Sequence, residues 1–600
     1  MVSVRQRMLA RCVGREKMRK IIYIFKRLFL VAPLAVIVTI VYYICNACVP
    51  AVRTILYAEI FQGVLDWNEQ KSMEVLLESI GLYLAIQLGI YLLNYAYSVL
   101  VNTGVFEKGN MHFRMQLQRT TTRLSMYELE DTTVLDKKKR AEQTIEEETL
   151  VMVFYQTLEI LTAAGAMFTM VCVICNYHWG LAALLIFTAI PVPIAKILRG
   201  RSHVRVQNAQ AKAARRADYY WKLLTEKDSV KELRVLGCEE YLTDKWKKEN
   251  NRIKRTVCKE KRIDARVFLI CDIIKLLGYF GAFASAVLLV VHQQIEINVF
   301  GAILSALPGM QSAMEDFMDA AGELPELLGL SQNYEEYRKL PECQDGTNRK
   351  NKIQMNISME KVFFKYPNAE EWALSGVDLV LKQGQHIAVV GENGSGKSTL
   401  LRVLLGIYPA QRGGVLVDGT PIEEYEKKSL YRNISMVSQK FVHYYLTLRE
   451  NVGISDYNRL WQDEEISAAM EKAGFREPVL LEEQLGAEYG GREFSVGQWQ
   501  KLAIARAFFK QYDFIVMDEP TSALDAITEV QVLRTFLTAM TGKTAVVISH
   551  RIGICSKMDC IIVMKNGCVA EVGNHKELLQ RNGEYAKLYQ AQAKWYTETI

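Results

Sequence analysis

Long apolar runs dominate the first half of the chain and predict membrane-crossing helices. A helix needs about 20 mainly apolar residues to cross a bilayer, and six stretches come close to this requirement: 28–49, 79–103, 160–177, 181–198, 267–291 and 298–322. Glu315, Asp316 and Asp319 interrupt the second half of the sixth stretch, so we expect that helix to continue out of the bilayer into water. The pattern predicts an all-α transmembrane domain over residues 28–337, with six helices and two long polar loops.

The pattern changes after a polar, turn-rich segment at 338–352, which we interpret as a linker. From residue 353 to 600, short β-branched runs alternate with helical stretches. This alternation is typical of an α/β domain with a largely parallel sheet. The fold class predicted is therefore a multidomain membrane protein with a helical domain followed by an α/β domain.

Charge refines the picture of the N-terminus. Residues 1–27 carry nine Lys and Arg residues against a single Glu, although the whole chain has a net charge of only +6. A nucleic-acid-binding arm is one interpretation. We favour a basic cytoplasmic segment before a membrane helix, because an apolar run follows directly, and we expect no nucleic-acid partner. That run is too long for a typical signal peptide and lacks a clear cleavage site.

The basic residues also set the orientation. The segment at 196–266 is rich in Lys and Arg, residues 137–140 read Lys-Lys-Lys-Arg, and the segment after the first span has only Arg53 and Lys71. Basic loops stay on the cytoplasmic side of a membrane. Both termini and both long loops should therefore be cytoplasmic.

A phosphate-binding loop is predicted at residues 391–399, where GENGSGKST matches the pattern G-x-x-x-x-G-K-[ST]. A β-branched strand precedes it and a helix follows, so backbone N–H groups at a positive helix end would cradle phosphates. Lys397 should reach the β- and γ-phosphates, and Ser398 should offer its hydroxyl to Mg²⁺. The nucleotide-binding residues predicted here are Gly391, Asn393, Gly394, Ser395, Gly396, Lys397, Ser398 and Thr399.

Two adjacent carboxylates end the apolar strand FIVMDEP at 514–520. We expect Asp518 to hold Mg²⁺ through a water molecule. Glu519 comes next, and on an extended strand consecutive side chains point to opposite sides. One acid can then serve the metal while the other addresses a water molecule.

The segment FSVGQ at 494–498 stands between the phosphate loop and the acidic strand. This order resembles the nucleotide-binding domain of ATP-binding cassette (ABC) transporters, and the six spans before it resemble an exporter-type half-transporter. The resemblance implies ATP and Mg²⁺ as cofactors, with Ser398, Gln439 and Asp518 on the metal. It implies that Glu519 polarises the attacking water, that His550 touches the γ-phosphate, and that Tyr366 stacks on adenine.

In that family the signature segment closes on the ATP of a second cassette, so the resemblance implies a dimer. The residues that match this signature are Ser495, Val496, Gly497 and Gln498, and those that match the loop between cassettes are Ser522, Ala523, Leu524 and Asp525. Phe494 replaces the usual Leu, and Val496 replaces the usual Gly. Because Val is bulky and restricts the backbone, it could weaken closure without abolishing it. Homodimer and heterodimer both remain open.

The function expected is ATP-driven export across a membrane, with hydrolysis coupled through short helices near residues 126–137 and 227–237. The chain loosely resembles bacterial peptide and bacteriocin exporters, so a peptide is the first cargo hypothesis and a bacterial plasma membrane the expected location. A drug or lipid exporter and a membrane sensor that does not pump are the alternatives. The acids of the sixth span either line a cargo cavity or form the wet face of a helix, and Asp272 with Lys275 can neutralise each other.

Overall fold

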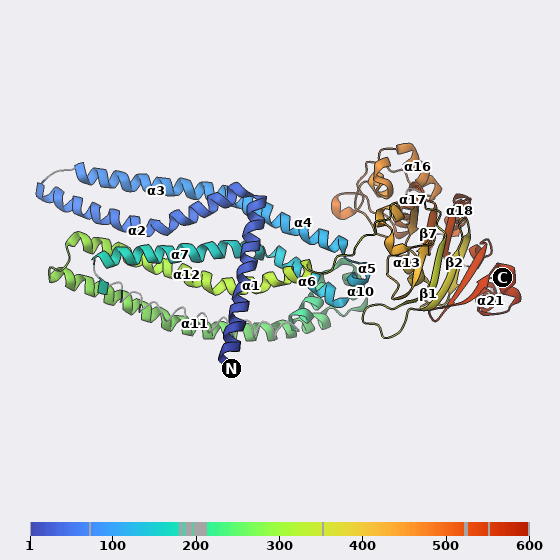
Figure 1. Cartoon of the computed structure of the whole chain (residues 1–600), viewed down its shortest axis with the longest axis horizontal. Coiled ribbons are helices and arrows are strands. Elements are labelled where there is room, and N and C mark those ends of the chain that lie inside the picture. The colour runs from blue at the N-terminus through green and yellow to red at the C-terminus, as the bar shows by residue number, and fades with distance from the viewer. Residues whose placement is uncertain are drawn as a thin grey trace. The chain divides into compact units, whose positions relative to one another are not determined.

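The computed structural model describes residues 2–70, 74–177, 213–350, 353–520, 526–549 and 552–597, with isolated positions between 179 and 195. The chain divides into two compact units. The helical unit comprises residues 1–120 and 137–339, and the cassette unit comprises residues 121–136 and 340–600. The first unit consists of helices, and the second combines β-strands with shorter helices (Figure 1).

Long helices make up the helical unit. Its described elements are α1 (Val2–Val31), α2 (Pro33–Gln70), α3 (Glu74–Leu100), the π-helical turn η1 (Val101–Glu107), α4 (Lys108–Arg123), α6 (Thr132–Glu146), α7 (Thr149–Tyr177), α10 (Lys227–Leu236), α11 (Glu239–Val291) and α12 (Ile297–Arg338). Helices α2, α7 and α12 pack against one another. Small residues such as Ala282 and Ala286 of α11 and Ala306 of α12 let the helices approach closely in the core.

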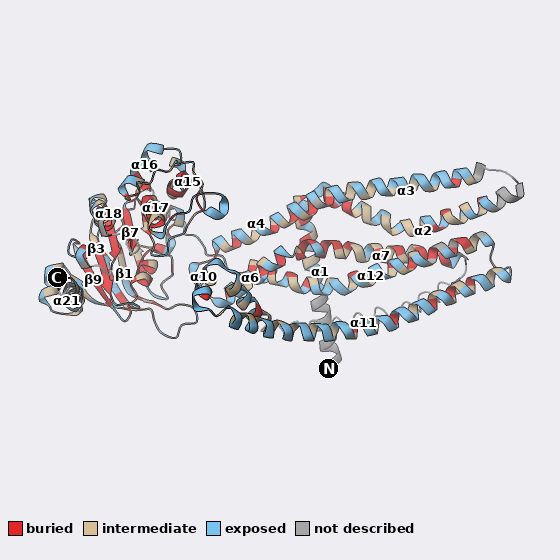
Figure 2. Cartoon of the chain, turned by 180° about the vertical axis from the view of Figure 1, so that it is seen from behind, coloured by how far each residue is buried: buried red, intermediate tan, exposed pale blue. Residues whose placement is uncertain are grey.

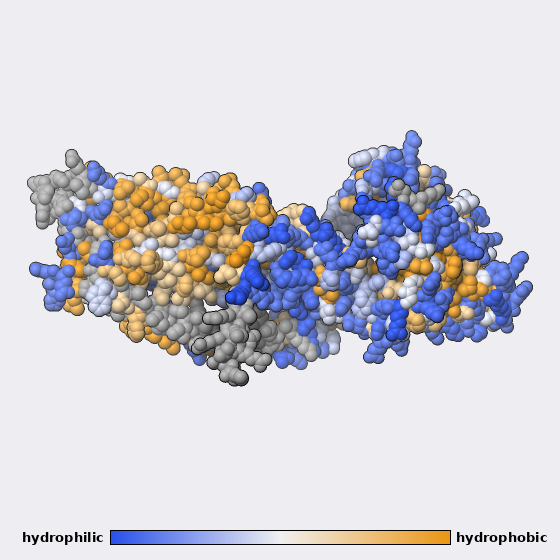
Figure 3. Space-filling model, in the orientation of Figure 1, coloured by the Kyte–Doolittle hydropathy of each residue, from blue (hydrophilic) through white to orange (hydrophobic). Residues whose placement is uncertain are grey.

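Four of the described helices are long and apolar enough to cross a membrane: Pro33–Val64, Leu76–Arg123, Thr149–Asn176 and Glu239–Val291. Within the most apolar window of each, only 6–28% of the residues are buried, so most of the apolar side chains face outward (Figure 2). Figure 3 shows the resulting orange band on the helical unit, with blue surface at both ends. An exposed apolar band of this kind is what a lipid environment requires.

The helix boundaries differ in detail from the predicted spans. The first apolar stretch was expected to begin at residue 28, but the chain breaks at Ala32 and the spanning helix α2 begins at Pro33. Proline lacks an N–H and favours the first helical position, so it ends one helix and starts the next. The expected span at 181–198 lies almost entirely outside the described residues. The sixth span remains a prediction, within the 42-residue helix α12.

The cassette unit contains two β-sheets. A six-stranded sheet has the order β10-β9-β3-β8-β7-β6, in which β10 is antiparallel to β9 and the other neighbours are parallel. Its strands are β3 (His386–Gly391), β6 (Ile434–Val437), β7 (Phe514–Asp518), β8 (Thr544–Ile548), β9 (Cys560–Lys565) and β10 (Cys568–Gly573). A four-stranded antiparallel sheet has the order β2-β1-β4-β5, from β1 (Ile357–Phe364), β2 (Leu374–Leu381), β4 (Arg412–Val417) and β5 (Thr420–Pro421).

Helices complete the cassette unit: α5 (Met126–Leu129), α13 (Lys397–Leu404), α14 (Lys427–Arg432), α15 (Leu448–Gly453), α16 (Asp463–Lys472), α17 (Val496–Phe509), α18 (Ala526–Ala539), α19 (Ile552–Cys555), α20 (His575–Gln580) and α21 (Glu584–Thr597). Successive residues of β3 enter different cores, Ile387 and Val389 on one face and Ala388 and Val390 on the other. Coverage on both faces explains why the parallel strands are continuously apolar. Because these strands run parallel, the carboxyl ends of β3, β6 and β7 lie along one edge of the sheet.

Candidate nucleotide-binding site

The phosphate-binding loop joins the end of β3 to the start of α13. Gly396, which precedes the helix, has φ = +99°, and a Cβ there would lie 2.7 Å from the Ala373 carbonyl oxygen. A Cβ on Gly391 would collide with the carbonyl oxygen of Met564 on the neighbouring strand. Only glycine fits these two positions. The loop can therefore hold its backbone N–H groups close to a bound phosphate, at the positive end of α13.

The side chain of Lys397 is hydrogen-bonded to the backbone of this loop. Its Nζ donates hydrogen bonds to the carbonyl oxygens of Gly391 (2.9 Å) and Glu392 (2.8 Å), and the side chain is buried. Burial lowers the pKa of Lys397, while the negative charges of Glu519 and Asp518 partly oppose this effect. The buried Lys397 ammonium group donates to loop carbonyl oxygens and interacts with two acids. It can exchange these hydrogen bonds for bonds to phosphate oxygens.

Asp518 ends β7 and is buried, with 6% of its surface exposed. Burial raises the pKa of its carboxyl group, and a hydrogen bond with Ser398 pulls the pKa down again. Its Oδ1 has no hydrogen-bond partner among the described residues. Such a half-satisfied buried carboxylate beside a hydroxyl fits the oxygen ligands that Mg²⁺ prefers. Among the described residues, no group of three or more His, Cys, Asp or Glu side chains could hold a metal ion without further ligands.

Glu519 differs from its expected geometry. An extended backbone was expected, but Glu519 has φ = +50°, in the left-handed region, and its N–H donates to the Ile548 carbonyl oxygen at 3.1 Å. The turn points the side chain toward the loop after β6, where Gln439 Nε2 donates to Glu519 Oε2 at 2.8 Å. Non-glycine residues in this conformation are strained and concentrate at functional sites. The structure thus joins Gln439 and Glu519, residues 80 positions apart.

Tyr366 lies beside α13. Its hydroxyl is 3.0 Å from Thr399 Oγ1, Arg402 Nη1 donates to it at 3.2 Å, and its ring meets Phe364 edge to face with centroids 5.2 Å apart. The side chain is half-buried. These contacts fix an aromatic ring next to the phosphate loop. Asn393 and Gly394, at the tip of that loop, are exposed.

The signature segment sits at the N-terminus of α17. Ser495 is the N-cap: its hydroxyl accepts from the N–H of Gln498, and the Gln498 side chain accepts from the N–H of Ser495. This reciprocal arrangement satisfies two of the otherwise unpaired donors at the helix start. Gly497 lies in the first turn, and Val496 is 60% exposed. The signature thus forms an exposed helix end within this chain.

The two unusual signature residues have different environments. Phe494 is 5% exposed and its ring packs against Phe475 (5.6 Å between centroids) and Trp499 (5.9 Å). An aromatic ring here fills the core beneath the helix end. Val496, by contrast, starts the helix in a conformation that valine accepts readily. The chain's own fold therefore does not require glycine at 496, and any effect of its bulk would be on a facing surface.

Several predicted residues cannot be placed. His550 and the segment of Ser522, Ala523, Leu524 and Asp525 lie outside the described residues. The residues brought together along the carboxyl edge of the sheet are the phosphate loop, Gln439, Asp518 and Glu519. The signature residues belong to a separate helix end on the same unit.

One predicted coupling segment belongs to the cassette unit. Helix α5 begins after Ser125, which caps it in a reciprocal pair with Glu128. Tyr127 and Glu130 bind the cassette: Gln411 Nε2 donates to the Tyr127 hydroxyl at 3.0 Å, and the Tyr408 hydroxyl donates to Glu130 Oε1 at 2.7 Å. Burial and the bond to Glu130 raise the pKa of Tyr408. The other predicted coupling segment is α10, in the helical unit, which leaves Val235 88% exposed.

Two arginines with structural importance were missing from the sequence interpretation. Arg506 of α17 donates to the carbonyl oxygens of Asn451 and Val442, and burial lowers its pKa to about 10. It ties the signature helix to the segment that follows Gln439. A single arginine in the apolar run of 502–509 was the available signal, because buried cations need partners.

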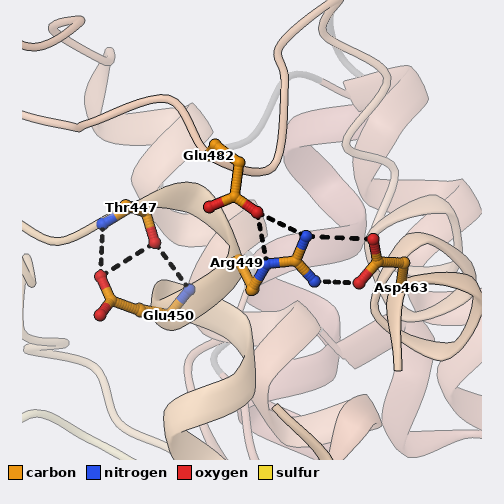
Figure 4. Close-up of polar contacts among 5 residues, drawn as sticks. All are labelled: Thr447, Arg449, Glu450, Asp463 and Glu482. Atoms are coloured by element: carbon orange, nitrogen blue, oxygen red, sulfur yellow. Dashed lines mark hydrogen bonds and ion pairs between the residues drawn. The ribbon is translucent and has the colours of Figure 1, made fainter. Parts of the chain in front are cut away.

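Arg449 provides a second tie (Figure 4). Its guanidinium group, on α15, donates to Glu482 from Nε and Nη2 and forms a two-bond ion pair with Asp463. The adjacent Thr447 and Glu450 cap the same helix reciprocally. Bidentate pairs of this kind fix geometry as well as energy. The network holds three segments around the signature helix in one arrangement.

Comparison with known proteins agrees with this geometry. Residues 147–314 match the ABC transporter transmembrane region, and residues 374–522 match the ABC transporter family. The chain is 27% identical to the nisin transport ATP-binding protein NisT of Lactococcus lactis subsp. lactis over 91% of each chain. It is 28% identical to the subtilin transport ATP-binding protein SpaT of Bacillus subtilis, over 79% of this chain and 78% of that one.

Other relatives match a smaller part. The ATP-dependent lipid A-core flippase of Pseudomonas putida is 36% identical over 44% of each chain. Among solved structures, a bacterial Atm1-family ABC exporter with ATP bound superposes with a TM-score of 0.77, at 20% identity, over 92% of this chain and 98% of that one. This likeness shows the fold.

The predicted fold class is therefore confirmed: a helical transmembrane domain followed by an α/β nucleotide-binding domain. A chain with one such cassette works with a second half-transporter, and membrane localisation follows from its family and its apolar helices. From the matched domains and the phosphate-loop geometry we conclude that the chain belongs to the ABC transporter family, as an exporter-type half-transporter that hydrolyses ATP.

Proposed function

We propose that the chain exports a peptide across a bacterial plasma membrane, as one half of a dimeric ABC exporter. The observation that carries the proposal is the similarity to NisT, which extends over 91% of both chains and so includes the membrane helices that would contact cargo. SpaT adds a second peptide transporter at similar identity. Both termini and both long loops would face the cytoplasm, as the basic loop residues predict.

The reaction proposed is hydrolysis of MgATP. Mg²⁺ would neutralise the β- and γ-phosphates and orient them, held by Ser398, Gln439 and Asp518. Glu519, positioned by Gln439, would accept a proton from the attacking water. Lys397 would balance charge on the γ-phosphate, and His550 would contact the same phosphate.

Each site would be completed by the partner. Ser495, Val496, Gly497 and Gln498 would offer the N-terminus of α17 to the γ-phosphate held by the other cassette, with Ser522, Ala523, Leu524 and Asp525 between the two sites. The exposed, self-capped end of α17 supports this role, because exposed N–H groups at a helix start bind anions. Tyr366 would stack on the adenine ring.

Energy from cassette closure would reach the membrane helices through α5. Its contacts through Tyr127 and Glu130 support the assignment, because a helix that is hydrogen-bonded to Tyr408 and Gln411 must move with the cassette. Arg402 links this contact to the nucleotide side, since it binds the Tyr366 hydroxyl and lies over the Tyr408 ring, 5.7 Å from the centroid.

Lipid translocation is the second candidate, because the Pseudomonas putida flippase reaches 36% identity over 44% of each chain. That match covers less of the molecule than the NisT match does. A lipid exporter would use the same ATP site, so the cargo must be tested directly.

The test uses the full chain in proteoliposomes whose cassettes face outward. Labelled peptides of graded length and charge are offered in one set of vesicles, and a fluorescent phospholipid in another, with Glu519→Gln as the inactive control. We expect ATP-dependent peptide accumulation that the control lacks. Lipid movement without peptide uptake would establish the flippase function instead, and hydrolysis that moves neither cargo would point to a sensor.

A further inference from the structure

A basic groove lies where α1 meets the last turns of α12, and the proposed export function does not use it. The groove has a volume of about 580 Å³ and is lined by Arg15, Glu16, Arg19, Lys20 and Tyr23 of α1 with Glu335, Arg338 and Lys339 at the end of α12. Five of these side chains are cationic and two are acidic. Both elements belong to the helical unit.

The acids do not neutralise the groove. Glu335 is occupied within α12, where it accepts from Arg338 (3.2 Å) and Lys339 (2.8 Å). Lys20 has one long contact, 3.5 Å from Gln332 Oε1. Arg15 and Arg19 have no ion-pair partner among the described side chains, and both are exposed. Three cations of α1 therefore remain for a ligand, with Glu16 as the one acid beside them.

The groove is also held in shape. The Tyr23 ring has Arg338 on α12 4.8 Å from its centroid and Arg27 5.2 Å away, so two guanidinium groups are fixed against one aromatic ring. The Tyr23 hydroxyl donates to Gln116 of α4. Below, Ile24 and Leu28 are buried in the core of the helical unit. The cationic side chains of α1 therefore belong to a helix that is packed against the rest of the helical unit.

Exposed apolar residues of α1 lie beside these cations. Met18 follows Arg15 by three positions and Ile22 follows Arg19 by three, so each pair shares one side of the helix. Met18 is 57% exposed and Ile22 58%, four residues apart on one face, and Phe29 and Leu30 continue the exposed apolar surface. The helix crosses the long helices of the unit instead of running along them (Figure 1). A helix that lies across membrane spans, with exposed apolar residues flanked by Lys and Arg, has the composition of an interfacial helix.

We propose that this groove, defined by Arg15, Arg19, Lys20, Arg338 and Lys339, binds the phosphate headgroup of an acidic phospholipid in the cytoplasmic leaflet. The acyl chains would lie along Met18 and Ile22 while the cations hold the headgroup. The anionic surface of a membrane attracts such basic clusters, and Arg forks match phosphate oxygens. The groove includes the last residues of α12, after which the chain enters the cassette unit at residue 340. A lipid bound there would restrain the helix that leads into the ATPase.

The test compares full-length protein in nanodiscs of phosphatidylcholine alone and with phosphatidylglycerol, and counts bound phosphatidylglycerol by native mass spectrometry. The triple variant R15Q/R19Q/K20Q removes the groove's free cations. The matched control is K247Q/K248Q/K254Q, which neutralises three exposed lysines of α11. Each cation near an anionic surface contributes about a factor of five to binding, so we expect the groove variant to bind phosphatidylglycerol roughly 100-fold more weakly. The control should bind like the parent.

Equal loss in both triple variants would overturn the site, because it would show a general charge effect. A further arm adds inorganic phosphate at millimolar concentration. Retention of the lipid supports a headgroup held together with its chains, whereas displacement would show that free phosphate is the ligand and would contradict the proposal. Since the readout is lipid binding, it can fail while peptide export succeeds, and the reverse also holds.

Discussion

Two helix N-termini in the cassette unit show opposite solutions to the same physical problem, the unpaired N–H groups at a helix start. At α13, the loop folds over its own helix end, Lys397 is buried against loop carbonyls, and the neighbouring acids come from this chain. At α17, Ser495 and Gln498 cap the helix and Val496 is exposed. The first helix end lies among buried groups of this chain, whereas the second is capped by its own side chains and exposed.

In the proposed dimer, one chain would supply two unlike halves of a reaction site. The α13 half contains charge that is costly to bury, such as the unpartnered oxygen of Asp518. The α17 half is capped by Ser495 and Gln498, and Phe494 packs beneath it. Substitutions of the buried acid in the α13 half should therefore lower ATP turnover but raise the stability of the fold. Substitutions in the α17 half should lower ATP turnover without weakening ATP binding by the same chain.

The largest effect is expected from Glu519→Gln. If Glu519 accepts the proton of the attacking water, loss of its basicity should slow ATP turnover by about 10²- to 10⁴-fold. ATP binding should persist, since Lys397 and the loop are intact, and it can be measured with a fluorescent nucleotide. Glu464→Gln, on the exposed start of α16, is the matched control and should hydrolyse normally. Turnover that survives in Glu519→Gln would show that another group acts as the base.

Ser495→Ala examines the α17 half. The helix loses its N-cap, which costs about 1 kcal/mol, and the site loses a donor toward the partner's phosphate. We expect turnover to fall about tenfold or more while ATP binding by the same chain is retained. Asn574→Ala removes the equivalent cap from α20, far along the chain from the signature. If both variants lose stability and activity alike, the role of Ser495 is structural.

Asp518→Asn should improve stability while it damages function. Burial raises the pKa of Asp518, so the folded state prefers the protonated acid, and its ionised form costs stability. The cost is absent well below the ordinary pKa of about 4, grows as the pH rises from there to the raised pKa, and is complete above the raised pKa. Without Mg²⁺ and nucleotide, the variant should melt a few degrees higher, by roughly 3 °C, at pH 7.

The parent and Asp518→Asn should approach the same melting temperature in acid, and Mg²⁺-dependent hydrolysis should be lost in the variant. A melting difference that is independent of pH would mean that the carboxylate is not the source of the strain.

Val496→Gly should have the smallest effect. The side chain is exposed and packs in no core, so its loss should change the melting temperature by less than about 2 °C. If valine slows closure on the partner's nucleotide, turnover should remain or rise, within about threefold. Steady-state ATPase assays at saturating ATP measure this, and a large fall in activity would show instead that Val496 makes a productive contact.

The sequence predicts a functional site best where the residues that form it are neighbours along the chain. The phosphate loop and the Asp518–Glu519 pair are each contiguous, so the elements that carry them could be assigned before any coordinates. The signature is also contiguous and could be recognised by its residues. The backbone at Glu519 could not be predicted, because its left-handed φ occurs together with a hydrogen bond to Ile548 on another strand. The burial of Phe494 likewise depends on Phe475 and Trp499 around it.

Contacts between distant segments escaped prediction for the same reason. Arg449 reads as an ordinary polar residue, and only folding brings Asp463 and Glu482 to its guanidinium group. Pro33 was a signal for the break between the first two helices. The apolar run continues on both sides of it, however, so the hydrophobic pattern alone did not show the change of helix direction. The spacing of apolar residues predicts which side chains are buried, whereas the point at which a helix changes direction depends on single residues such as Pro33.

The most direct test of the account is complementation between two inactive chains. Lys397→Ala disables the α13 half, and Ser495→Arg disables the α17 half with a bulky charge. Each alone should be inactive, whereas a mixture of both should recover roughly a quarter of the parent ATPase activity, because mixed pairs keep one intact composite site. The double variant mixed with either single variant should recover none. If differently tagged mixed dimers are isolated and remain inactive, the two halves do not complete each other across chains, and the proposal that both chains build each ATP site is wrong.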